Sequence, residues 1–426
     1  LNQPYTRALR VNLLLRPDGT PPCPIEGLGA PVPWAKGAYF VEGDARPGLS
    51  PLHEGGLFYM QEPSALTAVT ALDPQPGERV LDLCAAPGGK STQIAALMAG
   101  RGLLCCNEPI PSRAQILSRN IERMGVRNAV VLSAMPDALA PRFPAFFDRI
   151  LVDAPCSGEG MFRRQPEARD EWDADAPRRC ADRQMEILAQ AAKMLRPGGT
   201  MVYSTCTFND TENEGVLKRF LALHPEFSLV PFALPGLPEA KDGYLHLYPH
   251  EMRGEGHFVS RLKKADGADG ADAPVQAAPQ RKAPARAAAK GKAPAPIALP
   301  DVFSDAFAPE RLYTAGDALW MLPEGISIER LSGLRVLRTG LLLAHAEGKR
   351  SEPDHALAMA LRPEEAARTA SLTQTQALAY QAGETLSLGD LPSGYTLLCC
   401  EGVSLGWGKQ AGGLMKNHYP KGLRRR

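Results

Sequence analysis

The hydrophobic pattern between residues 76 and 262 changes its period repeatedly along the chain. Short apolar runs of four or five residues alternate with longer segments in which apolar residues recur every three or four positions. The short runs are typical of buried strands, and the longer segments are typical of helices. Strands that alternate with helices predict an α/β fold, in which helices cover both faces of a parallel sheet. The predicted strands span 79–83, 102–106, 129–132, 149–152 and 200–203, and the predicted helices span 91–99, 111–124, 184–195 and 211–223.

The regions on either side of this pattern have a different character. Residues 1–70 are rich in proline and loop signals, and we interpret them as a small α+β cap. In 263–296 the small and charged residues dominate and Val275 is the single large apolar side chain, so this stretch cannot offset its ordering entropy by burial. We therefore predict four parts: an N-terminal cap over 1–70, an α/β domain over 71–262, a flexible linker over 263–299 and a C-terminal α+β region over 300–426.

Composition and charge exclude several classes of protein. The 426 residues carry 48 basic and 47 acidic side chains, and no run approaches the ~18 apolar residues of a membrane span. Nine cysteines without paired metal-ligand spacing argue against a disulfide scaffold and favour reduced thiols in the cytoplasm. His246, His250 and His257 lack the further ligands that would complete a zinc site, so we expect no metal.

The two ends of the chain add two expectations. The chain begins with Leu1 rather than Met and shows no signal peptide, so we expect part of the cap to precede it. From 402 to 426 there are six basic residues and no acidic one. A basic end of this kind commonly contacts a polyanion, although a solvated terminus is the alternative.

A turn of small residues connects the first predicted strand to the first predicted helix. Two kinds of nucleotide site fit it. Gly89-Lys90-Ser91 matches the end of a phosphate loop, but that motif requires glycine at position 84, and Pro87 removes an amide donor. In the alternative, a Rossmann-like site, Glu108 ends the second strand 19 residues after Gly89 and binds ribose hydroxyls. Because GxGxxG is absent, S-adenosylmethionine is favoured over a dinucleotide. The turn comprises Cys84, Ala85, Ala86, Pro87, Gly88, Gly89 and Lys90.

Two cysteines follow the fourth and fifth predicted strands. Cys156 lies in Asp153-Ala154-Pro155-Cys156-Ser157-Gly158, and Cys206 lies in Ser204-Thr205-Cys206-Thr207. Ligands bind at the carboxyl ends of parallel strands, so both thiols and Asp153 should face the same crevice as the turn. A thiolate that adds to C6 of a pyrimidine makes C5 able to accept a methyl group.

Other groups at the predicted crevice suit the remaining steps of that chemistry. Asp153 suits support of the charge that develops on the ring, and Cys156 is a candidate base for the C5 proton. Lys90 is a candidate to lower a thiol pKa or to hold the carboxylate in place.

These three motifs, in this order and spacing, resemble the signature of the Sun family of RNA cytosine-5 methyltransferases, over about residues 55–262. The resemblance implies a Rossmann-like S-adenosylmethionine-dependent methyltransferase sheet. It implies that Cys206 is the C6 nucleophile, that Cys156 assists release of the product, and that residues 84–90, Glu108 and Asp153 contact S-adenosylmethionine. After the third predicted strand the first acidic residue is Asp137, five residues beyond the strand end. The residue that contacts adenine therefore stays unassigned.

The C-terminal end extends the resemblance. Gly406-Trp407-Gly408-Lys409 and residues 417–424 are similar to the bacterial F-type branch of that family, which acts on small-subunit ribosomal RNA. This similarity implies that 300–426 binds RNA and includes a module like a PUA domain. The implied partner is ribosomal RNA or the small ribosomal subunit, and no oligomer is predicted.

The sequence thus predicts methylation of C5 of cytidines in 16S ribosomal RNA, in the cytoplasm. Transfer RNA as substrate, uracil as target base, a non-catalytic RNA-binding assembly factor and a phosphate-loop ATPase remain as alternatives. In the insert after Cys156, five arginines are candidates to contact RNA phosphates, although a solvated helix face explains them equally well: Arg163, Arg164, Arg178, Arg179 and Arg183.

Overall fold

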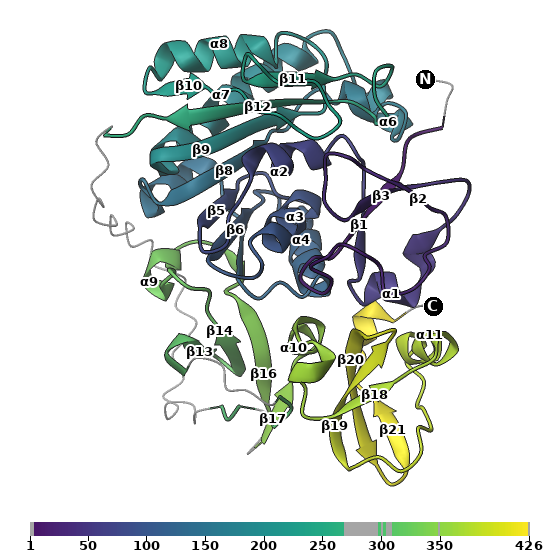
Figure 1. The fold of residues 1–426 in the computed structure, drawn as a ribbon. Coiled ribbons are helices and arrows are strands. Elements are labelled where there is room, and N and C mark those ends of the chain that lie inside the picture. The colour runs from purple at the N-terminus through teal and green to yellow at the C-terminus, as the bar shows by residue number, and fades with distance from the viewer. Residues whose placement is uncertain (1–3, 268–296, 300, 304–308, 348–349, 425–426) are drawn as a thin grey trace.

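A computed structural model describes residues 4–267, 297–299, 301–303, 309–347 and 350–424 (Figure 1). A nine-stranded sheet forms its centre, in the order β10-β12-β9-β8-β5-β6-β7-β15, with β11 paired to β12. The five predicted strands are confirmed and run parallel to one another. The bounds are β5 Arg79–Asp82, β6 Leu103–Asn107, β7 Ala129–Leu132, β8 Phe147–Asp153, β9 Leu195–Thr205, β10 Phe227–Leu229, β11 Tyr244–Leu247, β12 His257–Lys264 and β15 Val336–Arg338.

Helices cover both faces of this sheet, as the alternating pattern predicts. Successive strand residues point to opposite faces, so Val80 and Leu104 contribute to one core while Leu81 and Leu103 contribute to the other. Helices α2, α3 and α4 pack on the first face, and α7 and α8 pack on the second. The bounds are α2 Leu66–Leu72, α3 Gly89–Leu97, α4 Pro111–Arg123, α5 Pro136–Leu139, α6 Pro166–Asp170, α7 Ala176–Met194 and α8 Glu214–Leu223.

The N-terminal region forms a four-stranded antiparallel sheet in the order β2-β3-β1-β4. Its edge strand β4 contacts α3, and this contact places the sheet against the start of the central domain (Figure 1). The bounds are β1 Ala8–Val11, β2 Leu28–Pro31, β3 Ala38–Val41, α1 Pro51–Glu54 and β4 Phe58–Gln61.

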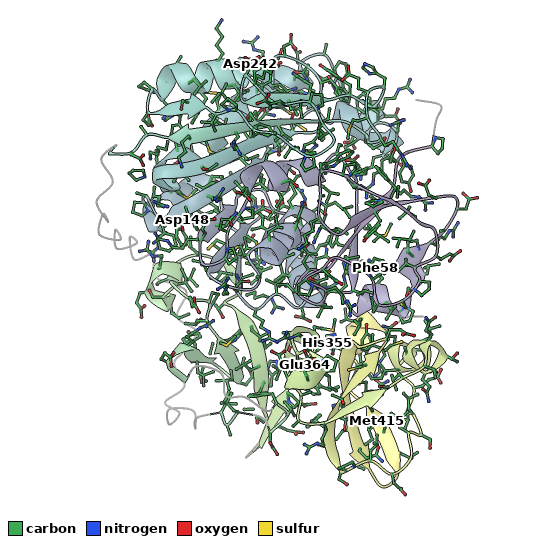
Figure 2. The ribbon with its side chains drawn as sticks, in the orientation of Figure 1. Phe58, Asp148, Asp242, His355, Glu364 and Met415 are labelled. Atoms are coloured by element: carbon green, nitrogen blue, oxygen red, sulfur yellow. The ribbon has the colours of Figure 1, made fainter. Side chains whose placement is uncertain are left out.

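The C-terminal region contains two further four-stranded sheets, β13-β14-β16-β17 and β18-β19-β20-β21. Phe58 of the N-terminal sheet and Met415 of the last sheet belong to one hydrophobic core, and both are labelled in Figure 2. The bounds are β13 Leu312–Ala315, β14 Ala318–Met321, α9 Ile328–Leu331, β16 Leu341–Glu347, β17 Arg350–Pro353, α10 His355–Ala360, β18 Thr369–Ser371, α11 Gln374–Ala382, β19 Gly394–Cys400, β20 Val403–Ala411 and β21 Leu414–Asn417.

The C-terminal region also completes the central sheet. Strand β15 pairs antiparallel with β7, and the backbone N–H of Ser133 donates to the carbonyl of Arg335 at 2.9 Å. Beside this pairing, the buried guanidinium of Arg338 forms an ion pair with Glu122 of α4. The free edge that β7 would otherwise present is therefore covered by a segment roughly 200 residues later in the chain.

The structure differs from the sequence prediction at the start of the linker. Strand β12 continues through Lys264, because Lys263 pairs with Thr200 and Lys264 pairs with Phe227. The central domain thus extends two residues past the predicted boundary at 262, and residues 268–296 of the predicted linker lie outside the described residues. No helix within the described ranges combines the length and the apolar character that a membrane span requires.

Candidate active site

The carboxyl ends of β5, β8 and β9 meet at one edge of the central sheet and border a cavity of about 230 Å³. Asp153 ends β8 and Cys206 directly follows β9, and both line this cavity. Residues from the turn after β5 line it as well. We call this space the catalytic cavity, and the turn residues that line it are Cys84, Ala85, Ala86, Pro87, Gly89 and Lys90.

Three predicted site residues lie outside the lining. Gly88 faces α4, where a Cβ would come within 3.2 Å of the Leu117 side chain, and its φ of +113° suits glycine. Glu108 is buried at the end of β6, where its carboxylate accepts a hydrogen bond from the N–H of Ile110 at 3.0 Å. Cys156 lies directly behind Cys206. The turn, Asp153 and Cys206 therefore face one cavity, as the topology predicts, whereas Cys156 does not line it and reaches the site through its contact with Cys206.

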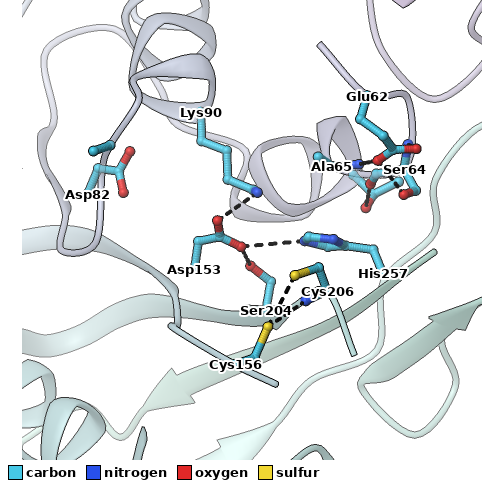
Figure 3. Close-up of polar contacts among 12 residues, drawn as sticks. Glu62, Ser64, Ala65, Asp82, Lys90, Asp153, Cys156, Ser204, Cys206 and His257 are labelled. Carbon is cyan, nitrogen blue, oxygen red and sulfur yellow. Dashed lines mark hydrogen bonds and ion pairs between the residues drawn. The ribbon is translucent and has the colours of Figure 1, made fainter. Parts of the chain in front are cut away.

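The Asp153 carboxylate is the centre of a polar network (Figure 3). Lys90 Nζ donates to its Oδ2 at 2.8 Å, and Ser204 Oγ donates to its Oδ1 at 2.8 Å. His257 Nε2, from the start of β12, lies 3.5 Å from Oδ1. These partners hold the carboxylate at the carboxyl end of β8, between the turn and Cys206.

The electrostatics of this network favour a charged pair. Burial by itself would raise the pKa of Asp153, but the Lys90 ammonium and His257 hold that pKa well below its ordinary value. Burial likewise opposes the charge on Lys90, yet the Asp153 carboxylate holds the pKa of Lys90 above its ordinary value. At neutral pH the site therefore contains an ionised carboxylate beside an ammonium group.

The two thiols are in direct contact. The sulfurs of Cys156 and Cys206 are 3.1 Å apart, and the backbone N–H of Cys206 donates to Cys156 Sγ at 3.3 Å. The hydrogen bond to Cys206, together with burial, raises the pKa of Cys156 well above its ordinary value. Cys156 therefore keeps its proton and holds it next to the sulfur that faces the cavity.

A buried carboxylate holds the loop that carries Cys156. Glu212 accepts hydrogen bonds from the N–H of Ser157 at 3.0 Å and from the side chains of Gln184 at 2.8 Å and Asn209 at 2.9 Å. Sequence reasoning missed this group, because Glu212 reads as part of the first turn of a helix. The cluster of polar residues directly after Cys206 was the available signal.

Further lining residues were not assigned to the site from the sequence. They include His257, which begins β12, and Tyr59 and Gln61, which belong to β4 of the N-terminal sheet. The three histidines considered for zinc lie apart: His246 contacts Glu214, His250 lies beside Glu251, and His257 contacts Asp153. In the described ranges, no group of three or more His, Cys, Asp or Glu side chains is placed to hold a metal ion.

The five arginines after Cys156 have different surroundings. Arg163 forms an ion pair with the buried Glu255, at 2.8 Å, and Arg179 forms an exposed ion pair with Asp173, at 2.7 Å. Arg164 lines the catalytic cavity. Of these five candidates, Arg164 is the one that the structure places at the site.

The turn after β5 fits S-adenosylmethionine. Gly89 packs closely on Tyr59, since a Cβ at this position would lie 3.2 Å from the ring and would require it to shift. At the start of the turn, Asp82 Oδ2 accepts from Ser91 Oγ at 2.6 Å, whereas its buried Oδ1 has no partner among the described residues. Burial raises the pKa of Asp82 to about 7. The small residues of the turn let a ligand approach the backbone closely. The unpartnered Asp82 oxygen and the carboxylate of Glu108, directly after β6, are hydrogen-bond acceptors, and this combination suits a nucleoside ligand.

Four family models match consecutive parts of the chain. Their descriptions are the N-terminal domain of 16S rRNA methyltransferase RsmF for residues 1–63, 16S rRNA methyltransferase RsmB/F for 69–263, the RsmF rRNA methyltransferase first C-terminal domain for 300–361, and the methyltransferase RsmF PUA domain for 367–425. Together they span each region that contains a sheet.

Whole-chain relatives agree with these matches. The ribosomal RNA small subunit methyltransferase F of Erwinia tasmaniensis is 34% identical, over 99% of this chain and 91% of the relative. The protein of the same name from Escherichia coli O127:H6 is also 34% identical, with the same two coverages. A crystal structure of a methyltransferase homologue from Pyrococcus horikoshii is 31% identical, with a TM-score of 0.51 over 62% of this chain and 87% of that one.

Sequence identity above 30% over nearly the whole chain, together with a fold and a set of motifs that agree, rules out the phosphate-loop alternative. The chain belongs to the 16S rRNA methyltransferase RsmB/F family.

Proposed function

We propose that this protein methylates C5 of cytidines in 16S ribosomal RNA, with S-adenosylmethionine as the methyl donor. The observation that carries the proposal is the pair of thiols 3.1 Å apart, of which Cys206 lines a cavity that it shares with the Asp153–Lys90 pair. A cavity-facing thiol with a second thiol behind it suits reversible addition to a ring carbon. The description of the matching family and the names of the relatives support 16S ribosomal RNA as the substrate.

Cys206 is the nucleophile in this proposal. Its sulfur forms a bond to C6 of the cytosine, and the thiol proton passes to ring N3, so that C5 becomes electron-rich. The Asp153–Lys90 pair supports the charge that develops at N3 and at the exocyclic amino group. S-adenosylmethionine, which residues 84–90, Glu108 and Asp153 would hold, supplies the methyl group when bound.

Cys156 assists release of the product. Because Cys156 keeps its proton, it donates this proton to Cys206 as the bond between sulfur and C6 breaks, and it takes up the proton that leaves C5. The proton on N3 then returns to solvent, so that one proton is released for each methyl group transferred. Both thiols end the cycle as they began it.

The proposal is tested by incubating the protein with labelled S-adenosylmethionine and, separately, with unmodified 16S ribosomal RNA, small ribosomal subunits or transfer RNA. Mass spectrometry then identifies the labelled nucleoside. We expect 5-methylcytidine in the 16S RNA, either free or in the subunit. A Cys23→Ala variant is the matched control, because Cys23 is a half-buried thiol outside the catalytic cavity.

Other outcomes would correct specific parts of the proposal. Label only in transfer RNA would overturn the substrate, and label in 5-methyluridine would overturn the target base. Cofactor binding without label in any RNA would favour a non-catalytic RNA-binding assembly factor.

A further inference from the structure

A second cavity, also of about 230 Å³, opens beside the catalytic cavity. It lies between the N-terminal segment and the loop before α6, which are adjacent in Figure 1. The two cavities share one wall, formed by residues 60–62 together with Arg164. We call the second cavity the flanking groove. Its remaining lining includes Tyr5, Arg7, Arg46 and Pro47. A chain that enters one cavity can thus continue into the other.

The flanking groove carries an excess of positive charge. Three guanidinium groups line it, against the single carboxylate of Glu62. That carboxylate is already occupied, since it accepts hydrogen bonds from the backbone N–H groups of Ser64, Ala65 and Glu255 at 2.8–2.9 Å. These donors hold the carboxylate in place, and the three guanidinium groups leave the groove with an excess of two positive charges.

The arginines are also available for a ligand. Arg7 donates to the backbone carbonyls of Gly43 and Ala45, which orient the guanidinium without neutralising its charge. The side chains of Arg46 and Arg164 make no hydrogen bond or ion pair with any residue that the structure describes. Guanidinium groups of this kind are suited to bidentate contacts with phosphate.

An exposed aromatic ring lies among these charges. Tyr5 is 46% exposed and lines the flanking groove beside Arg7. An aromatic ring surrounded by unneutralised arginines is the combination with which proteins bind unpaired RNA, through base stacking and phosphate contacts. An acidic peptide would use the charges but would leave the ring unexplained.

We propose that the flanking groove binds the unpaired nucleotides next to the target cytidine. Tyr5 stacks on a neighbouring base, and Arg7, Arg46 and Arg164 bind the backbone phosphates. This inference rests on the proposed function, since a cytidine that enters the catalytic cavity must leave its stack and bring its neighbours with it. Arg164 lines both cavities and so contacts the phosphate at the junction.

The test compares Arg46→Ala, Tyr5→Ala and the double variant Arg46→Ala/Arg164→Ala with the unchanged protein. Arg101→Ala is the matched control, because Arg101 is exposed, lacks an ion pair among the described residues and precedes β6, at the opposite end of the strands. Affinity for unmodified 16S RNA is measured by fluorescence anisotropy as salt varies, and methyl transfer is measured in parallel. Unchanged melting temperature and cofactor affinity establish that each variant is folded.

We expect about tenfold weaker RNA binding for Arg46→Ala and for Tyr5→Ala, with a higher KM and little change in kcat. The magnitude of the slope of log affinity against log salt should fall by about 0.7 for Arg46→Ala and by twice that for the double variant. Each variant makes fewer phosphate contacts and therefore releases fewer counterions when it binds RNA. Tyr5→Ala should leave the slope unchanged, and Arg101→Ala should behave as the unchanged protein.

Failures of the two proposals are distinguishable. If the unchanged protein methylates RNA but the groove variants bind RNA with the same affinity and salt slope, the groove assignment is overturned and the proposed function stands. If the unchanged protein methylates no RNA, the proposed function fails. The binding measurement still decides the groove, because it requires no turnover. An effect of Arg101→Ala equal to that of Arg46→Ala would overturn the assignment as well.

Discussion

Cys206 and Cys156 have different surroundings although their sulfurs are in contact. Cys206 lines the catalytic cavity, whereas Cys156 lies behind it in a loop that Glu212 holds. In the proposed function the same residue type therefore takes two roles, one at the substrate and one at the nucleophile.

Replacing the cavity-facing thiol tests the first role. Cys206→Ala should lower methyl transfer by more than about a thousandfold, because the group that activates C5 is lost. Cofactor affinity should stay within about twofold, since this thiol attacks the RNA. Transfer of labelled methyl groups and calorimetric cofactor binding check both statements, and turnover retained by the variant would refute the assignment of the nucleophile.

Replacing the second thiol tests the release step. Cys156→Ala should accumulate a covalent complex between Cys206 and RNA, because addition still proceeds while the proton donor for release is absent. The complex should survive a denaturing gel. The double variant Cys156→Ala/Cys206→Ala is the control and should give no complex; an adduct in that variant would place the bond on another residue.

Lys90 controls the protonation of Asp153. The depressed pKa of Asp153 keeps its carboxylate ionised from pH 5 to pH 8, so its titration should not shape the activity profile there. In Lys90→Met the burial of Asp153 is no longer opposed by the ammonium, so that pKa rises and activity should fall as pH decreases through this range. Rates measured from pH 5 to pH 8 check this. A profile with the same shape as that of the unchanged protein would contradict it.

At the scale of elements, the parallel strands were predictable because each is an apolar run buried on both faces. The pattern predicts a start of α7 at 184, but the helix begins at Ala176, because its first turns are mostly polar and carry no apolar period. Strands β10 and β15 have three residues each, too few for a periodic signal. Their positions follow from pairing with distant strands.

The same reasoning explains what was predictable at the site. The turn, Asp153 and the thiols follow predicted strand ends, so the topology brings them together. His257 begins an antiparallel strand, and Tyr5 and Arg46 belong to the N-terminal region. Tertiary packing brings these residues to the sheet edge, and no local pattern in the sequence indicates that position.

Glu62 should stabilise the connection between β4 and α2. Its buried carboxylate accepts backbone hydrogen bonds from Ser64, Ala65 and Glu255, so it ties this connection to the segment before β12. In Glu62→Gln an amide NH₂ replaces one acceptor oxygen and faces N–H donors. We expect the free energy of unfolding to fall by about 2 kcal/mol, measured by urea denaturation. The exposed Glu239→Gln is the control, and an equal loss in both variants would contradict this role.

At the scale of the whole molecule, the catalytic and C-terminal regions share buried contacts. Helix α10 packs against α4 of the central domain and against β20 of the last sheet. His355, the first residue of α10, is half-buried at this junction and is labelled in Figure 2. Its Nδ1 is buried and has no hydrogen-bond partner among the described residues. Burial lowers the pKa of His355 to about 4.

Because the pKa of His355 is lowered in the folded protein, we expect the free energy of unfolding to decrease in acid. In the unfolded chain His355 binds a proton below about pH 6.5, whereas in the folded protein it does so only near pH 4. The free energy of unfolding should therefore fall between these pH values, by about 3 kcal/mol from this group. His355→Phe, which cannot titrate, should show a shallower fall when denaturation is compared at pH 7.5 and pH 4.5. Identical pH dependences would show that this histidine is not responsible.

The pairing of β15 with β7 has a consequence for how the protein is made. A ribosome adds about 5–20 residues per second, so roughly 10–40 s separate the emergence of β7 from that of β15. During that interval the nascent central sheet has an open edge next to β7, with unpaired N–H and C=O groups. The C-terminal region, which is synthesised after the central domain, thus closes the central sheet, and we expect the newborn chain to depend on protection of that edge until β15 emerges.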